Sequence, residues 1–192
     1  MLVVEIKSMS PNKKIIILQG GSGSGKTETV RFLESKGIPK IITHTTRKPK
    51  AGEVDKKDYY FVTGDEFKDI DMVESAEYSG NIYGTSRWEL ETKLQKYDTV
   101  CTVMESQGAL RFKDEYPDST IIIFYPISKE NMRTNLSKRG DSEELIAERL
   151  ATAEKIQENS QCPYADYVIN SNDLQFKLKS VMRALRDAGI NI

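Results

Sequence analysis

The sequence has few cysteines, no excess of either charge and no long apolar run. Its two cysteines, Cys101 in a strand-like run and Cys162 beside Pro163, are too few for a disulfide framework and indicate free thiols. With 28 Lys plus Arg against 29 Asp plus Glu, the overall charge does not favour nucleic acid as a partner. No run could span a membrane, and the start, MLVVEIKSMSPNKK, is too charged for a signal peptide. We expect a cytoplasmic protein that binds neither membrane nor nucleic acid; its oligomeric state stays open.

The most informative stretch is KKIIILQGGSGSGKT, residues 13–27. A buried-strand pattern runs into glycines and then into a helix start, and the spacing fits G-x-x-x-x-G-K-[ST], the loop that wraps nucleotide phosphates. Consecutive backbone N–H groups wrap the anion, a lysine reaches the β- and γ-phosphates, and the Thr27 hydroxyl ligates magnesium. The alternative is a flexible Gly/Ser connection, which the strand-to-helix context disfavours. The predicted ATP-binding residues are Gly20, Gly21, Ser22, Gly23, Ser24, Gly25, Lys26 and Thr27.

Strand and helix patterns alternate along most of the chain, which predicts an α/β fold with a parallel sheet covered on both faces. Between Thr43 and Trp88 the pattern changes to short runs punctuated by glycine and proline, which predicts small antiparallel strands. The predicted strands lie at about 14–19, 41–42, 99–104, 119–125 and 165–170, and the predicted helices at about 25–36, 86–96, 106–115, from 128, from 141 and 172–188.

Three further clusters contain side chains suited to a ligand. Arg47 and Lys50 lie three residues apart around a proline turn, so both can face one phosphate; alone, they would be read as a solvated basic loop. Glu74 lies on a predicted strand, and its carboxylate could accept two N–H groups from guanine, although such a residue is more often on a surface strand. Arg139 and Arg149 flank a break at Gly140 and could close over transferring phosphates, or simply form a solvated helix face.

Taken together, these motifs resemble the guanylate kinase family. They are the phosphate loop, THTTR-x-P-x-x-GEV with Tyr59, E-x-x-E-Y-x-G-N-x-YGTS, and RG-DSEE-x-I-x-x-R, in that order from about Ile15 to Leu174. The resemblance implies a P-loop NTPase three-layer fold with an inserted, mainly β, nucleoside-monophosphate-binding domain and a small helical lid. It implies ATP-dependent phosphorylation of GMP, and of dGMP, by direct in-line transfer with Mg²⁺. The implied ranges are 1–42, 97–135 and 150–192 for the core, 43–96 for the insertion and 136–149 for the lid.

The resemblance also implies roles for single residues. Thr43, Glu74, Thr85 and Glu105 would bind the guanine side of GMP, and Arg47, Lys50, Tyr59 and Tyr83 its phosphate. The implied catalytic residues are Lys26, Arg47, Arg139 and Arg149, and the implied metal ligand is Thr27. The lone histidine, His44, is predicted to be structural, because phosphoryl transfer needs positioning more than a base.

The sequence departs from the family pattern at several positions. Lys50 stands where the family usually has arginine, and Asn135 stands at the first lid arginine. The family's Asp-x-Asp on the third core strand falls at Val103 and Glu105, so the first carboxylate is missing, and Glu28 replaces a small hydroxyl residue. Two alternatives therefore stay open: a divergent enzyme acting on another nucleotide or phosphorylated acceptor, and a non-catalytic interaction module of the same fold.

Overall fold

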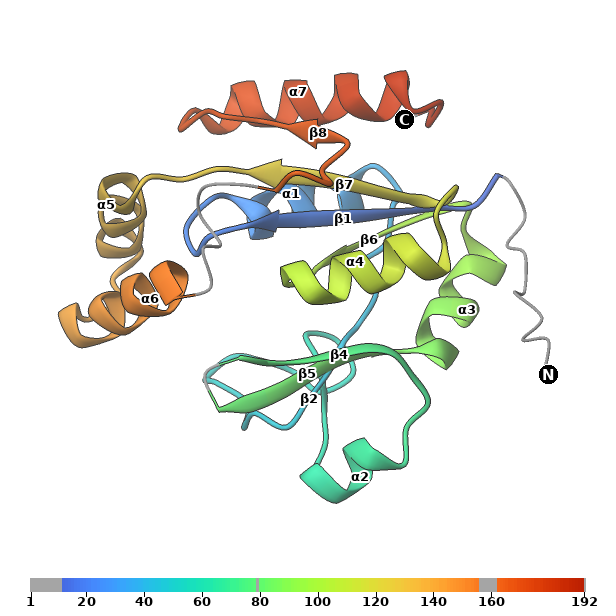
Figure 1. Ribbon diagram of the computed structural model, residues 1–192, viewed down its shortest axis with the longest axis horizontal. Helices are drawn as coiled ribbons and strands as arrows, with labels where there is room; N and C mark the ends of the chain where they lie inside the picture. Colours follow the sequence, from blue (N-terminus) through green and yellow to red (C-terminus); the bar gives the residue numbers. More distant parts are fainter. Residues whose placement is uncertain (1–11, 79, 156–161, 192) are drawn as a thin grey trace.

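The computed structural model describes residues 12–78, 80–155 and 162–191, which form two sheets and the helices around them (Figure 1). The larger sheet is parallel and has the order β6-β1-β7-β8. Its middle strands are continuous apolar runs that are buried on both faces, as a central parallel strand requires. The sequence also predicts a loosely attached lead-in over residues 1–12, of which only Asn12 lies among the described residues. In sheet order the strands are β6 (Thr99–Val103), β1 (Lys14–Gly20), β7 (Thr120–Tyr125) and β8 (Tyr167–Val168).

Alternate residues of β1 enter two separate apolar clusters, because successive side chains of a strand point to opposite faces. Ile16 and Leu18 pack with α1 and α7, whereas Ile15 and Ile17 pack with α3 and α4. Helices therefore cover both faces of the sheet, which confirms the predicted three-layer α/β core. The bounds are α1 (Lys26–Ser35), α3 (Arg87–Lys96), α4 (Ser106–Glu115) and α7 (Leu174–Asp187).

The smaller sheet is mixed and has the order β3-β2-β5-β4. The β2–β5 and β4–β5 pairs are antiparallel as predicted, but β2 and β3 pair in parallel, because the long loop between them returns the chain to the same end. The predicted strand at 41–42 is also wrong: only Lys40 forms a bridge, to Cys101, before the chain leaves the core. This sheet and its helix comprise β2 (His44–Thr45), β3 (Tyr60–Phe61), α2 (Gly64–Lys68), β4 (Met72–Tyr78) and β5 (Asn81–Ser86).

A helical hairpin, α5 (Lys129–Arg139) and α6 (Glu143–Lys155), lies beside the carboxyl ends of β1 and β7 (Figure 1). The sequence predicts Ser128 as an N-cap, with Glu130 close behind it, and Ser128 does cap α5, accepting a hydrogen bond from the Asn131 N–H. The run SKRGD, residues 137–141, predicts a break in the helical pattern, but the helix continues to Arg139 and ends at Gly140, whose left-handed φ of 88° stops it. Within the described residues, no helix is long and apolar enough to cross a membrane.

Candidate functional site: a phosphate loop facing two groups of cations

The loop between β1 and α1 has a backbone that only glycine allows at several points. Gly20, Gly23 and Gly25 have φ values of 136°, 77° and 98°, all in the region that side chains disfavour. A Cβ atom at Gly20 would lie 2.3 Å from the Tyr125 carbonyl oxygen, so a side chain there is excluded outright. Gly25 is the N-cap of α1 and provides no side-chain cap, which leaves the first N–H groups of the helix for an anion.

The Lys26 side chain folds back along this loop. Its Nζ donates to the Gly20 carbonyl and, at 2.9 Å, to the Gly21 carbonyl. The ammonium group therefore lies at the mouth of the loop, where a bound polyphosphate would be, and the loop carbonyls hold it until an anion arrives. The predicted role of Lys26, contact with the β- and γ-phosphates, stays a prediction.

Two other helices hold two further carbonyls of the loop. The Asn135 amide of α5 donates to the Gly23 carbonyl at 3.0 Å, and the Lys177 ammonium of α7 donates to the Ser24 carbonyl at 2.7 Å. Sequence reasoning missed Lys177. The signal was its spacing: it lies four residues before the apolar Val181, so helical periodicity places a lysine on the buried face of α7.

The donor set at this loop suits a magnesium ion that is bound mainly through a nucleotide. Thr27 offers one exposed hydroxyl oxygen in the first turn of α1. Val103 gives no oxygen and packs against the apolar cluster of Ile16 and Leu18. Over the described ranges, no three His, Cys, Asp or Glu side chains form a metal-binding group. Magnesium commonly keeps its waters and takes phosphate oxygens, so one protein hydroxyl is compatible with it.

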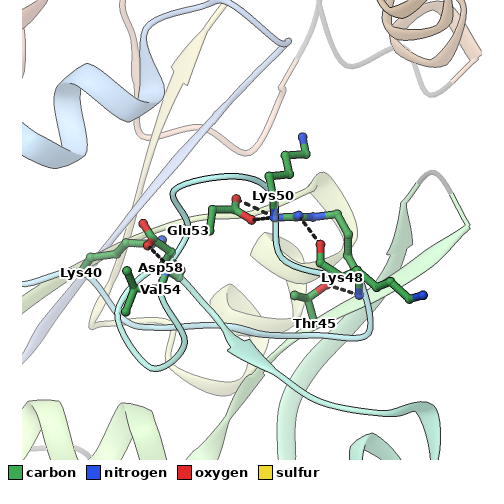
Figure 2. Close-up of polar contacts among 8 residues, drawn as sticks. Lys40, Thr45, Lys48, Lys50, Glu53, Val54 and Asp58 are labelled. Atoms are coloured by element: carbon green, nitrogen blue, oxygen red, sulfur yellow. Dashed lines mark hydrogen bonds and ion pairs between the residues drawn. The ribbon is translucent and has the colours of Figure 1, made fainter.

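Arg47, on the loop after β2, is held in place by acceptors on the same loop. Its Nη2 donates to Glu53 Oε1 at 2.8 Å, and its Nη1 donates to the Lys48 carbonyl at 2.7 Å. Figure 2 shows these contacts, and also shows the Lys50 side chain extending away from Glu53. The backbone N–H of Lys50 donates to the second oxygen of Glu53 at 2.7 Å. Glu53, which the sequence marked only as part of GEV, therefore organises the basic loop.

Tyr59 links this basic loop to the start of the insertion. The Arg47 guanidinium lies 5.4 Å from the centre of its ring and the Lys40 ammonium 4.9 Å, and the Tyr83 ring approaches edge-on at 6.1 Å. Burial raises the pKa of Tyr59, so its hydroxyl keeps its proton and can donate a hydrogen bond. The predicted phosphate ligands Arg47, Tyr59 and Tyr83 are thus brought together.

Arg139 and Arg149 of the helical hairpin converge on a carboxylate that the sequence did not single out. Arg139 Nε donates to Asp141 Oδ1 at 2.8 Å, and Arg149 Nε lies 3.5 Å from Asp141 Oδ2. Arg149 also donates to Ser22 Oγ of the phosphate loop at 2.6 Å. The hydrogen bond from Arg139 lowers the pKa of Asp141, so a carboxylate occupies the place between the arginines.

The positive charges of the basic loop and the hairpin act on one another. The pKa of Lys50 is lowered first by burial, then by the positive charges of Arg47 and Arg149, and more weakly by Arg139. Lys50 of the basic loop therefore lies within electrostatic reach of Arg149 and Arg139 of the hairpin. Their repulsion would be relieved by phosphate groups placed between them.

Glu74 is an acid buried where the insertion meets the core. Its side chain is 5% exposed, and burial raises its pKa, an effect that neighbouring Thr85 and the charge of Arg111 partly oppose. Helix α4 packs against it so closely that a Cβ atom at Gly108 would lie 2.7 Å from Glu74 Oε2. A buried carboxylate needs hydrogen-bond donors, and the side chain and backbone of Thr85 provide them here.

The other predicted base-binding residues lie around Glu74. Thr85 is paired with it across β4 and β5. Thr43 precedes His44, which pairs with Gly84, so Thr43, Thr85 and Glu74 follow one another across neighbouring strands. Glu105 is the N-cap of α4, the helix that packs on β4. The predicted site thus has two ends, a base end at Glu74 and a phosphate end at the cations.

Comparison with known proteins points to one family. A family model described as "Guanylate kinase" matches residues 12–188. A protein named "Guanylate kinase" from Prochlorococcus marinus subsp. pastoris is 34% identical, over 91% of this chain and 97% of its own length. Another of that name, from Lactococcus lactis subsp. lactis, is 41% identical, over 79% of this chain and 78% of its own length.

The fold has a counterpart among solved structures. The crystal structure of guanylate kinase from Anaplasma phagocytophilum superposes with a TM-score of 0.71 at 28% sequence identity, covering 95% of this chain and 89% of that one. The similarity therefore extends over the core, the second sheet and the helical hairpin alike.

Proposed function

The chain belongs to the guanylate kinase family and shares its activity, and from this we propose which of its residues bind each substrate. The phosphate loop, Gly20–Thr27, binds ATP. GMP binds with its guanine at Glu74 and its phosphate at the basic loop of Arg47 and Lys50. The observation that carries this assignment is the buried Glu74 carboxylate, because it fits a ligand that presents two adjacent N–H donors. Guanine has such an edge and adenine does not.

We propose that four residues bind the GMP phosphate. Arg47 offers a planar fork already oriented by Glu53, while Lys50 adds a point charge. The Tyr59 and Tyr83 hydroxyls donate hydrogen bonds to the remaining oxygens. Because Lys50 cannot bind two oxygens in the plane of a fork, we assign the orientation of the phosphate to Arg47 and only charge neutralisation to Lys50.

We further propose that magnesium accompanies ATP, with the Thr27 hydroxyl as its protein ligand. When bound, the ion neutralises charge on the β- and γ-phosphates. Three side chains then stabilise the phosphates directly. Lys26 moves from the carbonyls of Gly20 and Gly21 to the phosphate oxygens. Arg139 and Arg149 move from Asp141 to the phosphoryl group that is transferred. Direct in-line transfer depends on this positioning of the phosphates and does not need a general base.

A coupled assay of ADP release tests the substrate assignment. With ATP as donor, we expect turnover with GMP and dGMP and less than about 1% of that rate with AMP, CMP or UMP, because a site built around a hydrogen-bonding group rejects ligands lacking its partner by large factors. A preference for another monophosphate would favour the divergent enzyme. ATP binding without turnover of any monophosphate would favour the non-catalytic module, which the intact Gly-Lys-Thr of the loop argues against.

Arg149→Ala should lower kcat more than it raises the KM of either nucleotide. The guanidinium already touches Ser22 of the phosphate loop, and its charge is most useful where negative charge develops in the transition state. We expect a loss of about 10²-fold or more in kcat. Arg133→Ala is the matched control, since Arg133 is a solvent-exposed arginine of the same hairpin paired with Glu143. A larger change in KM than in kcat for Arg149→Ala would contradict the role.

We propose the domain limits that the resemblance implies: a core of 1–42, 97–135 and 150–192, an insertion of 43–96 and a lid of 136–149.

Both cysteines, Cys101 and Cys162, are free thiols. Free thiols are the usual state in a reducing compartment, which supports a cytoplasmic location.

A further inference from the structure

Lys177 is a buried lysine in a place where an apolar residue would be expected. Its side chain is 5% exposed and lies on the face of α7 that also buries Val181, Ala184 and Leu185. Burial lowers its pKa, with the charge of Glu28 as the only opposing influence. Burying an ammonium group costs free energy that an apolar side chain would avoid. Stability of the fold therefore does not explain a lysine at this position.

The contacts of Lys177 all lead to the phosphate loop. Its Nζ donates to the Ser24 carbonyl at 2.7 Å and lies 5.8 Å from the centre of the Tyr125 ring. The side chain runs beside Gly25, where an added Cβ atom would be 3.5 Å from Nζ. The ammonium therefore lies against the Ser24–Gly25 peptide of the loop.

Because a peptide group is planar, the hydrogen bond from Lys177 to the Ser24 carbonyl also restricts the direction of the Gly25 N–H. In a trans peptide the carbonyl of one residue and the N–H of the next point in opposite directions, and the described residues contain no cis peptide. A donor that fixes the Ser24 carbonyl toward Lys177 therefore fixes the Gly25 N–H in the opposite direction, away from Lys177. A charged donor also polarises this N–H and strengthens the hydrogen bond it can give.

The neighbouring peptide is held in the same way. Thr29 Oγ1 donates to the Gly25 carbonyl at 3.0 Å and lies 3.1 Å from the Tyr125 hydroxyl. Lys177 lies over the ring of that same tyrosine. Two consecutive peptides of the loop, Ser24–Gly25 and Gly25–Lys26, are thus held by one group of contacting side chains: Tyr125, Thr29 and Lys177.

We propose that Lys177 is a positioning residue for ATP: it holds the Ser24–Gly25 peptide in the orientation in which the Gly25 N–H faces the bound phosphates. This inference rests on the proposed function in one respect, that the loop binds ATP. It adds a residue from the last helix of the chain to the determinants of ATP affinity. The lysine does not contact the phosphates and acts only through the backbone.

The test compares Lys177→Met with Lys179→Met, because Lys179 is an exposed lysine on the same helix. For Lys177→Met we expect an ATP dissociation constant by calorimetry, and a KM for ATP, about tenfold higher, which corresponds to about 1.4 kcal/mol. The KM for GMP should stay within twofold of wild type, and the thermal midpoint of unfolding should be equal or higher. Lys177→Arg keeps a charged donor that can stack on Tyr125, so it should recover most of the ATP affinity.

Several results would overturn the proposal. They are unchanged ATP binding in a folded Lys177→Met variant, an equal rise in the KM of both nucleotides with a lower unfolding midpoint, and the same effect from Lys179→Met. If Lys177→Met does not fold, the identical measurements on Lys177→Gln decide the question. The two hypotheses fail differently: wild-type protein that binds no ATP would contradict the proposed function, whereas wild-type binding that Lys177 does not affect would contradict this inference alone.

Discussion

Lys26→Ala should abolish phosphoryl transfer while leaving the fold intact. The ammonium group lies at the mouth of the phosphate loop, held by the Gly20 and Gly21 carbonyls, from which it can move to the β- and γ-phosphates. A charge placed where negative charge builds up contributes several kcal/mol to the transition state, so we expect kcat to fall by about 10³-fold or more. Single-turnover transfer of phosphate from ATP to GMP is the measurement.

The control for this variant has to separate catalysis from stability. Removing Lys26 also removes two contacts to loop carbonyls, which should cost about 1 kcal/mol and lower the unfolding midpoint by roughly 2–4 °C. Lys36→Ala, at the exposed C-terminal end of the same helix, should change neither rate nor midpoint appreciably. Turnover near the wild-type rate in folded Lys26→Ala protein would refute the assignment of the loop.

The sequence predicts the parts of this protein that are encoded locally. The apolar run of β7, the glycine pattern after β1 and the Ser128 cap each act over a few neighbouring residues, and each is found where predicted. The mixed sheet is less predictable, because the direction in which β3 pairs with β2 depends on how the loop of residues 46–59 folds. His44, predicted to be structural, is buried and stacks on Tyr60 at 4.5 Å.

What the sequence did not indicate are contacts between elements far apart in the chain. Asp141 is a local exception: it lies two residues from Arg139, and it approaches Arg149 because the consecutive helices α5 and α6 fold back on each other. Lys177 reaches Ser24 across more than 150 residues, and Gly108 becomes important only because α4 packs on Glu74. Carboxylate, lysine and glycine are common at solvent-exposed positions, so their residue types alone give no signal.

Glu74→Gln should remove most of the guanine preference and raise the KM for GMP far more than that for ATP. The carboxylate is buried. The neutral amide that replaces it presents one acceptor and one donor, whereas the two N–H groups on the edge of guanine need two acceptors. The mismatched donor leaves a buried polar pair unsatisfied, so we expect kcat/KM for GMP to fall by about 10²- to 10³-fold. The ratio of GMP to AMP turnover is the measurement, and an unchanged ratio would mean that the base is read elsewhere.

The pH dependence tests the same residue independently. Burial raises the pKa of Glu74 above the usual range for a glutamate, and the ionised form is the one that accepts two N–H groups. In the wild-type protein, kcat/KM for GMP should therefore decline as the pH falls through this raised pKa, and the decline should be absent from Glu74→Gln.

Stability should change in the opposite direction to activity. Because folding raises the pKa of this carboxyl, keeping it ionised costs stability at every pH above its unfolded-state pKa, and this cost reaches its full size above the raised value. At pH 7 the unfolding midpoint of Glu74→Gln should equal or exceed that of wild type, by roughly 2–4 °C for each kcal/mol regained. Gly108→Ala is the structural counterpart: it leaves the carboxylate in place but pushes a methyl group against it, so it should weaken GMP binding without the gain in stability. A lower midpoint for Glu74→Gln would show that the carboxylate stabilises the fold instead of serving the ligand.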